Sequence, residues 1–463
     1  MSNANISQQT VDTLIADLKD ARQRTLALVD GLDAQQIIGP KLDTVNPLLW
    51  EIGHVAYFHE LWILRHLDNA DSFLKNADAL YDSINIAHND RWDLPLLSLD
   101  QTKHYMQQVL DAEINRLKNV KTVTAKDIYL TRYALFHEDM HTEAYTYTRR
   151  TLNYPAPEFS NTQLNDQQYN AEYNAGPLQG DVEIPGGEYL LGAPQDIDFC
   201  FDNEKWQHPV QVKPFAIARA ATTYQQFADF VNDGGYSNPQ FWDDGGWAWL
   251  QKNKVTQPNG WKKDGQKKDG LKKDDGKKNT EGNWLIKQFD QWQTLRPHAA
   301  VIHVNWFEAS AWCKWANRRL PSEAEWELAA SGTPKNINEK RPYPWGGARG
   351  NARGDGTPTE QHVNMNSRAL GTIDVGALPQ SDSAFGCRQM LGNSWEWVAD
   401  TFNPYPGFEA DMYQDYSQPL FGQTKVLRGG GWATPARMIR NTWRTYYGPD
   451  RNDVFAGFRS CAL

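Results

Sequence analysis

The sequence has few cysteines and no long apolar run, and these absences exclude several classes of protein. Its 463 residues include four cysteines, none spaced as Cys-x-x-Cys, which argues against a disulfide framework and a structural zinc site. No run of about 18 apolar residues is present, so we expect no membrane span. The N-terminal residues lack the charged and apolar regions of a signal peptide. We therefore expect a cytoplasmic protein.

An excess of positive charge is also absent. Lysine and arginine number 47 against 57 aspartates and glutamates, which gives a net charge of -10. This balance argues against a nucleic-acid-binding surface. The length of 463 residues is enough for two or three domains with cores of their own, and hydrophobic residues make up 40% of the chain and aromatic residues 12%. We expect a globular protein with neither a nucleic-acid nor a membrane partner.

The first third of the sequence has helical periodicity. Apolar residues recur at near-helical spacing, and helices are expected over 11–32, 47–67, 99–117 and 125–152. Four helices of this length predict an up-down bundle over residues 1–157, and bundle cores often hold metal sites. The connection over 71–97 is too long to be a plain connector.

The rest of the chain has a different pattern. Residues 158–180 are polar and rich in asparagine and glutamine, which is typical of a linker. Over 181–463, short apolar runs alternate with turn residues, and helices are expected only at 224–231 and 306–318. A lysine-rich repeat at about 262–278 indicates a solvated surface insertion, with a basic docking tail as the alternative. The whole chain is thus predicted to be an α+β protein, with a helical bundle followed by a loop-rich mixed domain.

Three histidines form the strongest candidate site. His137 and His141 are four residues apart on a predicted helix, so their imidazoles share a face about one turn apart. His54 lies on another predicted helix of the same bundle. Three imidazoles leave coordination positions open, and open positions indicate chemistry at the metal. Zinc and an iron(II) that handles O2 fit this ligand set about equally well.

Acidic residues surround the histidine pair. Glu138, Asp139 and Glu143 are typical of groups that support metal ligands. Glu143 follows the last histidine by two residues and points to a different helix face, so we expect it to be a supporting residue rather than a ligand. His59 and His66 are expected to be surface or packing residues.

Motifs in both halves resemble one enzyme family. The His-x-x-x-His-x-Glu pattern, together with the segment 50–55, resembles the sulfoxide synthases of ergothioneine biosynthesis (EgtB type). The second half resembles the formylglycine-generating-enzyme fold, which is C-type-lectin-like, in the segments 183–187, 319–327, 343–346, 391–397 and 426–432. A DinB-like four-helix bundle joined to this domain is similar to that family over nearly the whole chain.

The resemblance implies an enzyme that uses Fe(II), held by His54, His137 and His141, and O2. In this family, hercynine (Nα-trimethylhistidine) meets a sulfur donor, and a carbon–sulfur bond forms at the imidazole C2. The family's active-site tyrosine, a proton donor, corresponds to Tyr405 in a Tyr-Pro-Gly-Phe turn. From the residues alone, an ordinary packed tyrosine is the simpler interpretation. Formylglycine generation needs a pair of cysteines near the C-terminal arginine-rich segment, which this sequence lacks, so that activity is not expected.

The substrate pocket departs from the family's pattern. A loop that carries two arginines in the ergothioneine enzymes has His88 and Arg91 here, and a carboxylate of the C-terminal segment is replaced by Tyr447. Since charge-assisted hydrogen bonds are the strong ones, these losses should weaken the binding of γ-glutamylcysteine. They slightly favour a selenosugar donor, as in the relatives that make selenoneine (SenA type).

Seven residues are predicted to bind substrate. They are His88, Arg91, Met140, Trp443, Tyr446, Tyr447 and Arg451. The aromatic residues among them are suited to a cage for the trimethylammonium group of hercynine, and an ordinary place in the core fits them equally well.

Two other functions fit the same residues. One is a DinB-type thiol transferase that uses zinc or another divalent metal, and metal analysis would separate it from the iron enzyme. The other is a non-catalytic binding protein on the formylglycine-type fold, whose ligand binding would survive the substitution His137→Ala.

Overall fold

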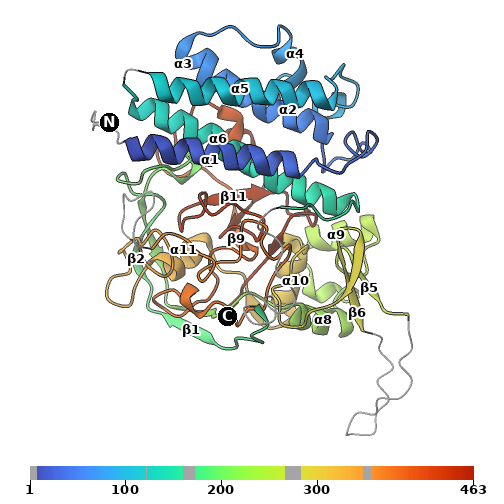
Figure 1. Cartoon of the computed structure of the whole chain (residues 1–463). Coiled ribbons are helices and arrows are strands. Elements are labelled where there is room, and N and C mark those ends of the chain that lie inside the picture. The colour runs from blue at the N-terminus through green and yellow to red at the C-terminus, as the bar shows by residue number, and fades with distance from the viewer. Residues whose placement is uncertain (1–7, 121, 160–172, 266–282, 348–355) are drawn as a thin grey trace. The chain divides into compact units, whose positions relative to one another are not determined.

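The computed structural model of the chain describes residues 8–120, 122–159, 173–265, 283–347 and 356–463. The chain divides into two compact units, Met1–Ser160 and Asn161–Leu463, which are coloured from blue to teal and from green to red in Figure 1. The helical first unit and the mixed second unit confirm the predicted α+β class. The exact domain boundaries 1–157, 158–180 and 181–463 stay predictions. Among the described residues, no helix combines the length and the apolar character that crossing a membrane requires.

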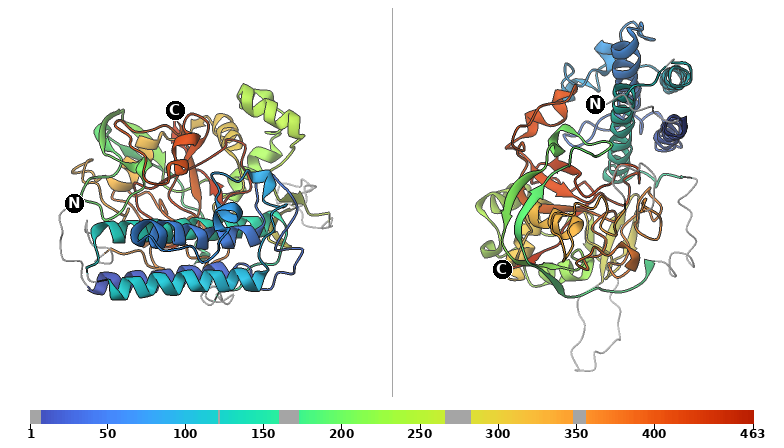
Figure 2. Two further views of the ribbon diagram at one scale, coloured as in Figure 1. Left: turned by 90° about the horizontal axis from the view of Figure 1, so that it is seen from above. Right: turned by 90° about the vertical axis from the view of Figure 1, so that its left-hand side faces the viewer.

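Four long helices build the first unit. They are α1 (Gln8–Ala27), α2 (Leu48–His59), α5 (Leu99–Asn119) and α6 (Ala125–Thr151). They lie side by side (Figures 1 and 2), with α1 against α6 and α2 against both α5 and α6. Capping boxes at Ser98 and Thr124 start α5 and α6, since each hydroxyl accepts a hydrogen bond from a first-turn backbone N–H. The predicted helices are present, although α1 ends at Ala27 rather than at residue 32.

Helix α2 continues beyond its regular part. It passes through a π-helical segment, η1 (Glu60–Arg65), into the short α3 (His66–Asp68). The connection that follows contains α4 (Ala77–Tyr81) and the 3-10 turn η2 (His88–Asp90). It folds back onto α2, where a Cβ at Gly53 would lie 2.2 Å from the Tyr81 ring. A glycine at residue 53 therefore permits the close approach that brings this connection beside His54.

Two four-stranded sheets form the second unit's framework. One has the order β1 (Asp181–Ile184), β4 (Phe215–Ala218), β13 (Cys461–Ala462) and β8 (Arg318–Arg319). The other has the order β11 (Arg444–Tyr447), β10 (Lys425–Arg428), β9 (Trp395–Thr401) and β12 (Ala456–Gly457). All pairs are antiparallel except β12 with β9. The C-terminal residues thus enter both sheets.

Smaller elements complete the second unit. Strands β2 (Gly187–Leu191) and β3 (His208–Val212) pair, as do β5 (Trp261–Lys263), β6 (Trp284–Gln288) and β7 (Gln291–Thr294). Among the described residues, the longer helices of this unit are α8 (Tyr224–Asn232), α9 (Asp244–Asn253), α10 (Trp306–Trp315) and α11 (Glu323–Ser331). The sequence predicted α8 and α10 but neither α9 nor α11.

Two predicted polar segments lie partly within the described residues. The lysine-rich insertion begins in β5, where Lys262 and Lys263 pair with β6, and its residues from 266 onward lie outside the described residues. The predicted linker, 158–180, is described at its two ends. Tyr173 near its second end is fully buried against Ile373, Ala377 and Leu378, so this end packs into the second unit's core.

Candidate metal centre and its surroundings

The three histidines predicted as metal ligands lie together in the bundle. His54 comes from α2 and the other two come from successive turns of α6. Their ring centroids are 4.6–5.1 Å apart. One nitrogen from each ring can be chosen so that all three lie within 4.8 Å of one another. The packing of α2 on α6 thus places three nitrogen ligands around one point.

Burial keeps two of these imidazoles neutral. His54 and His137 are almost fully buried, and this burial lowers the pKa of each well below its usual value of 6.5. Neighbouring imidazoles lower both values further. A neutral imidazole has a lone pair for a cation, whereas a protonated one has none. The two rings are therefore ready to bind a metal near neutral pH.

The tautomer of His54 is set by the connection that folds onto α2. Its Nδ1 lies 2.8 Å from the backbone carbonyl of Tyr81. Because a carbonyl only accepts hydrogen bonds, Nδ1 carries the proton and donates it, which leaves the Nε2 lone pair free. A hydrogen bond of this kind orients a metal-binding histidine.

Glu51 lies beside His141, and no local sequence pattern predicts this proximity. Its Oε1 lies 3.8 Å from Nδ1 of His141 and accepts a 2.8 Å hydrogen bond from Asn46. Within the described part of the chain, His141 Nδ1 and Glu51 Oε2 are buried without a hydrogen-bond partner. A cation on the triad would suit this buried carboxylate, because its charge balances the acid. The residues present therefore fit a divalent metal with imidazole ligands, iron(II) and zinc included.

Aromatic rings cover two of the ligands. Trp50 stacks on His54 with centroids 4.8 Å apart and planes at 8°, and Phe58 stacks on His137 at 3.7 Å and 10°. Trp50, His54 and Phe58 are spaced four residues apart, so they share one face of α2. This spacing is visible in the sequence and could have indicated the covered site.

Glu138 does not support the triad, contrary to our expectation. Its carboxylate accepts hydrogen bonds from Arg22 (3.0 and 3.2 Å) and Thr25 (2.7 Å) and lies 3.2 Å from His59 Nε2. On its other side, His59 Nδ1 is 2.9 Å from Glu113. His59 is 1% exposed, so it is not a surface residue. It belongs to a buried ionic cluster, because helix packing turns these side chains away from the metal ligands.

Among the predicted substrate residues of the first unit, Arg91 lies close to this site. Arg91 donates to Asn46 Oδ1 (2.8 Å), and its guanidinium carbon lies 4.0 Å from the centroid of Trp50, which stacks on His54. His88 is half-buried and its Nε2 donates to the Val45 carbonyl (2.8 Å). Met140 is partly exposed on α6, directly before the last histidine.

Tyr405 is buried in the second unit. Its ring lies 4.6 Å from that of His208 and 4.1 Å from the guanidinium carbon of Arg444. Its hydroxyl has no hydrogen-bond partner among the described residues. Burial raises the pKa of the phenol well above 10, so Tyr405 keeps its proton at neutral pH. A buried hydroxyl without a partner is unfavourable for folding alone.

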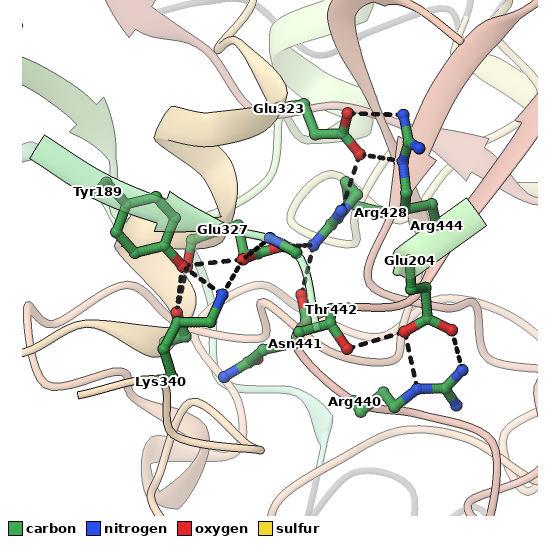
Figure 3. A network of polar contacts seen from close by, with 12 residues as sticks. Tyr189, Glu204, Glu323, Glu327, Lys340, Arg428, Arg440, Asn441, Thr442 and Arg444 are labelled. Carbon is green, nitrogen blue, oxygen red and sulfur yellow. Dashed lines mark hydrogen bonds and ion pairs between the residues drawn. The ribbon is translucent and has the colours of Figure 1, made fainter. Parts of the chain in front are cut away.

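The guanidinium beside Tyr405 is held by a buried ionic network (Figure 3). Glu323 accepts hydrogen bonds from Arg444 (2.7 and 3.0 Å) and from Arg428 (2.8 Å). Arg428 also donates to Glu327 (2.6 Å), which pairs with Lys340. These arginines come from adjacent strands, β11 and β10, so the network fixes both strands against α11.

The two tyrosines of β11, both predicted to bind substrate, have different neighbours. Consecutive strand residues point to opposite faces of a sheet, so Tyr446 and Tyr447 diverge. Tyr446 stacks on Phe402 at 4.0 Å, while the ring of Tyr447 lies 5.1 Å from the guanidinium of Arg451. The two tyrosines therefore have different ring neighbours, and the aromatic cage stays a prediction.

The other two predicted substrate residues of the second unit have partners in that unit. Arg451 is paired with Asp453 through two hydrogen bonds of 2.6 and 2.7 Å. Trp443 is buried, with its ring edge-on to Trp395 at 4.7 Å. The core interpretation thus applies to Trp443.

Comparisons with known proteins cover both units. Residues 167–462 match the sulfatase-modifying factor enzyme 1-like domain, and residues 17–144 match the DinB superfamily. The chain is 34% identical to a hercynine oxygenase of Mycolicibacterium thermoresistibile, over 96% of this chain and 94% of the relative. It is 32% identical to a hercynine oxygenase of Mycobacterium tuberculosis, over 97% and 98%. A formylglycine-generating enzyme of Thermomonospora curvata is 30% identical over 61% of this chain and 93% of its own length.

Proposed function

The chain belongs to the family of the hercynine oxygenases, and from this membership we propose that it joins sulfur or selenium to C2 of the hercynine imidazole with iron(II) and O2. The convergence of three histidines in the bundle carries this proposal. It is supported by a likeness to named hercynine oxygenases that extends over nearly the whole chain.

The proposed reaction balances without a further reductant. Hercynine loses the hydrogen on C2, and a thiol or selenol donor loses the hydrogen on its chalcogen. A carbon–chalcogen bond forms, and O2 supplies one oxygen to the sulfoxide or selenoxide. The other oxygen leaves as water with the two hydrogens, so O2 accepts four electrons in total. The same balance holds for sulfur and for selenium.

His54, His137 and His141 would hold the metal. When bound there, iron(II) would supply the site at which O2 is activated and the substrates are brought together. The chain's own residues prepare this site. Burial keeps His54 and His137 unprotonated, the Tyr81 carbonyl orients His54, and Trp50 and Phe58 exclude water from two of the rings.

Tyr405 is the proposed proton donor. Burial raises the pKa of its phenol, so Tyr405 carries its proton near neutral pH and that proton is available for transfer. Its hydroxyl makes no hydrogen bond within the described residues that would have to break before transfer. Met140, Tyr446, Tyr447 and Arg451 remain proposed substrate contacts, as does Trp443 despite its place in the core.

A donor with few carboxylates is proposed for the second substrate. The His88 side chain already donates a hydrogen bond to the Val45 carbonyl. Arg91 therefore carries the one guanidinium group of this loop that could bind a carboxylate. A bidentate arginine contact is a strong recognition element for a carboxylate, and a second one is missing. These features support a selenosugar over γ-glutamylcysteine.

We also propose a cytoplasmic location, since all four cysteines are free and buried, as a reducing compartment would allow.

Product analysis tests the proposal. Protein purified without oxygen is loaded with iron(II) and incubated with hercynine, O2 and either γ-glutamylcysteine or a selenosugar, and product masses are measured. The expected product is the chalcogen adduct at C2, formed faster with the selenosugar. His137→Ala should abolish it, while His66→Ala, an exposed histidine of the same unit, should not. Zinc at one equivalent with no adduct from either donor would refute the proposal and favour the thiol transferase.

A further inference from the structure

Arg91 reaches the surroundings of His54 through Trp50. Its guanidinium lies 4.0 Å from the centroid of the Trp50 ring, and the same ring stacks on His54 with planes at 8°. The indole is anchored at its edge, because Nε1 donates to the Leu80 carbonyl at 2.8 Å. Arg91 and Leu80 thus hold the ring that lies against the first metal ligand.

Arg91 also reaches His141, by a second and independent route. Its Nη1 donates to Oδ1 of Asn46, and Nδ2 of Asn46 donates to Oε1 of Glu51, both at 2.8 Å. A guanidinium only donates and a carboxylate only accepts, so only one orientation of the Asn46 amide satisfies both neighbours. The amide therefore connects the arginine to the glutamate with a defined direction.

The route from Arg91 ends at the Glu51 carboxylate, which lies near His141 without a hydrogen bond to it. Glu51 is 3% exposed, and its carboxylate lies 3.8 Å from His141 Nδ1, which is longer than a hydrogen bond. Neither His141 Nδ1 nor Glu51 Oε2 has a hydrogen-bond partner among the described residues. If the two groups approached to hydrogen-bond distance, Nδ1–H would donate to the carboxylate and the Nε2 lone pair would be left for a metal. Buried complementary groups left open in this way indicate a pair that closes on a ligand.

We infer that Glu51, Asn46 and Arg91 are positioning residues of the metal centre. Glu51 orients His141, Asn46 fixes Glu51, and Arg91 holds both Asn46 and the Trp50 ring on His54. The inference rests on the proposed function only in that the three histidines bind a divalent metal. It assigns to Arg91 a role in the metal centre in addition to any contact with a substrate.

Cobalt(II) is a suitable probe, because its visible absorption reports the ligand geometry independently of turnover. The full-length protein is titrated with cobalt(II) without oxygen, and both the dissociation constant and the spectrum are recorded. Glu51→Gln, Asn46→Ala and Arg91→Gln are expected to shift the absorption bands. Glu51→Gln should weaken binding by about 10- to 100-fold, the usual effect of losing a residue that supports a metal ligand.

The control is Glu60→Gln, another buried carboxylate of the same bundle, whose partners are Tyr105, Ser72 and the backbone of Phe73. It should bind cobalt as the wild type does. Wild-type affinity and spectrum in Glu51→Gln and Asn46→Ala would overturn the inference. If Glu51→Gln does not fold, as judged by circular dichroism, Asn46→Ala decides, because it leaves the carboxylate in place. Cobalt binding that His137→Ala leaves unchanged would overturn the proposed function as well, which distinguishes the two failures.

Discussion

Phe58 lies flat on His137, with ring centroids 3.7 Å apart and planes inclined by 10°. This contact restricts the rotation of the imidazole, because the ring can turn only by sliding against the phenyl face. We predict that Phe58→Leu weakens metal binding by about 10-fold, since a support of the ligand is lost. Isothermal titration with cobalt(II) measures this.

The matched control for Phe58→Leu is Phe227→Leu. Phe227 is a fully buried phenylalanine of the second unit, packed among Phe230, Trp261 and Phe458. Its substitution should lower stability by about 1–2 kcal/mol and leave metal affinity unchanged. Equal losses of affinity in both variants would show that the effect is one of general stability.

Tyr405→Phe should separate activity from stability. The hydroxyl has no hydrogen-bond partner among the described residues, so its removal should not lower the free energy of unfolding and should raise it by up to about 1–3 kcal/mol, because the desolvation cost of the hydroxyl is relieved. Loss of a general acid should lower product formation by about 100-fold or more. Thermal unfolding and product mass analysis measure the two effects.

Tyr189→Phe is the opposite case and serves as the control. The Tyr189 hydroxyl bonds to Glu327 (2.9 Å) and Ser331 (2.7 Å), so its loss should cost about 1–3 kcal/mol. The folded variant should keep its activity. Full activity in Tyr405→Phe would contradict the proton-donor role.

Glu323→Gln should destabilise the second unit strongly. Two buried guanidinium groups, from Arg428 and Arg444, hydrogen-bond to this one carboxylate. Removal of its charge leaves them undercompensated, which typically costs about 3–5 kcal/mol. Glu325→Gln on the same helix is the control, because its partner Arg319 is 38% exposed and such pairs contribute little. Urea unfolding that gave similar losses for both variants would contradict this prediction.

Apolar periodicity was sufficient to predict the long helices of the bundle. It did not predict helices whose formation depends on tertiary packing. The first turn of helix α9 contains Gly245 and Gly246, and glycine has a low helix propensity. Asp243 caps it by accepting from the backbone of Gly246, and a Cβ at Gly246 would lie 3.1 Å from Phe307. The close packing of Phe307 explains a helix that the local sequence disfavours.

The candidate metal site also combines local features, which the sequence predicts, with contacts that depend on tertiary packing. The four-residue spacing of His137 and His141 predicted two ligands on one helix face, because that relation is local. Glu51 is 90 positions away from His141 in the sequence, and their proximity depends on how α2 packs against α6. We therefore predicted that the acidic residues next to the histidines support the metal ligands. The packing of the helices instead places Glu138 against Arg22 and His59.

The buried cluster around His59 predicts a pH dependence of stability. Burial alone would lower the pKa of His59, but the carboxylates of Glu113 and Glu138 raise it to about 9, against 6.5 in the unfolded chain. Because the folded pKa is the higher one, the protonated histidine stabilises the fold fully below pH 6.5. This contribution is lost as the pH rises through 9, and it amounts to at most about 3 kcal/mol.

The difference in melting temperature between the wild type and His59→Gln measures this contribution. The variant should be clearly less stable at pH 6.5, and the difference should narrow steadily toward pH 9 and above. His104→Gln, an exposed histidine on α5, should show no such trend. A difference that stays constant from pH 6.5 to 9 would mean that His59 is neutral in the folded protein and does not contribute a positive charge to balance Glu113 and Glu138.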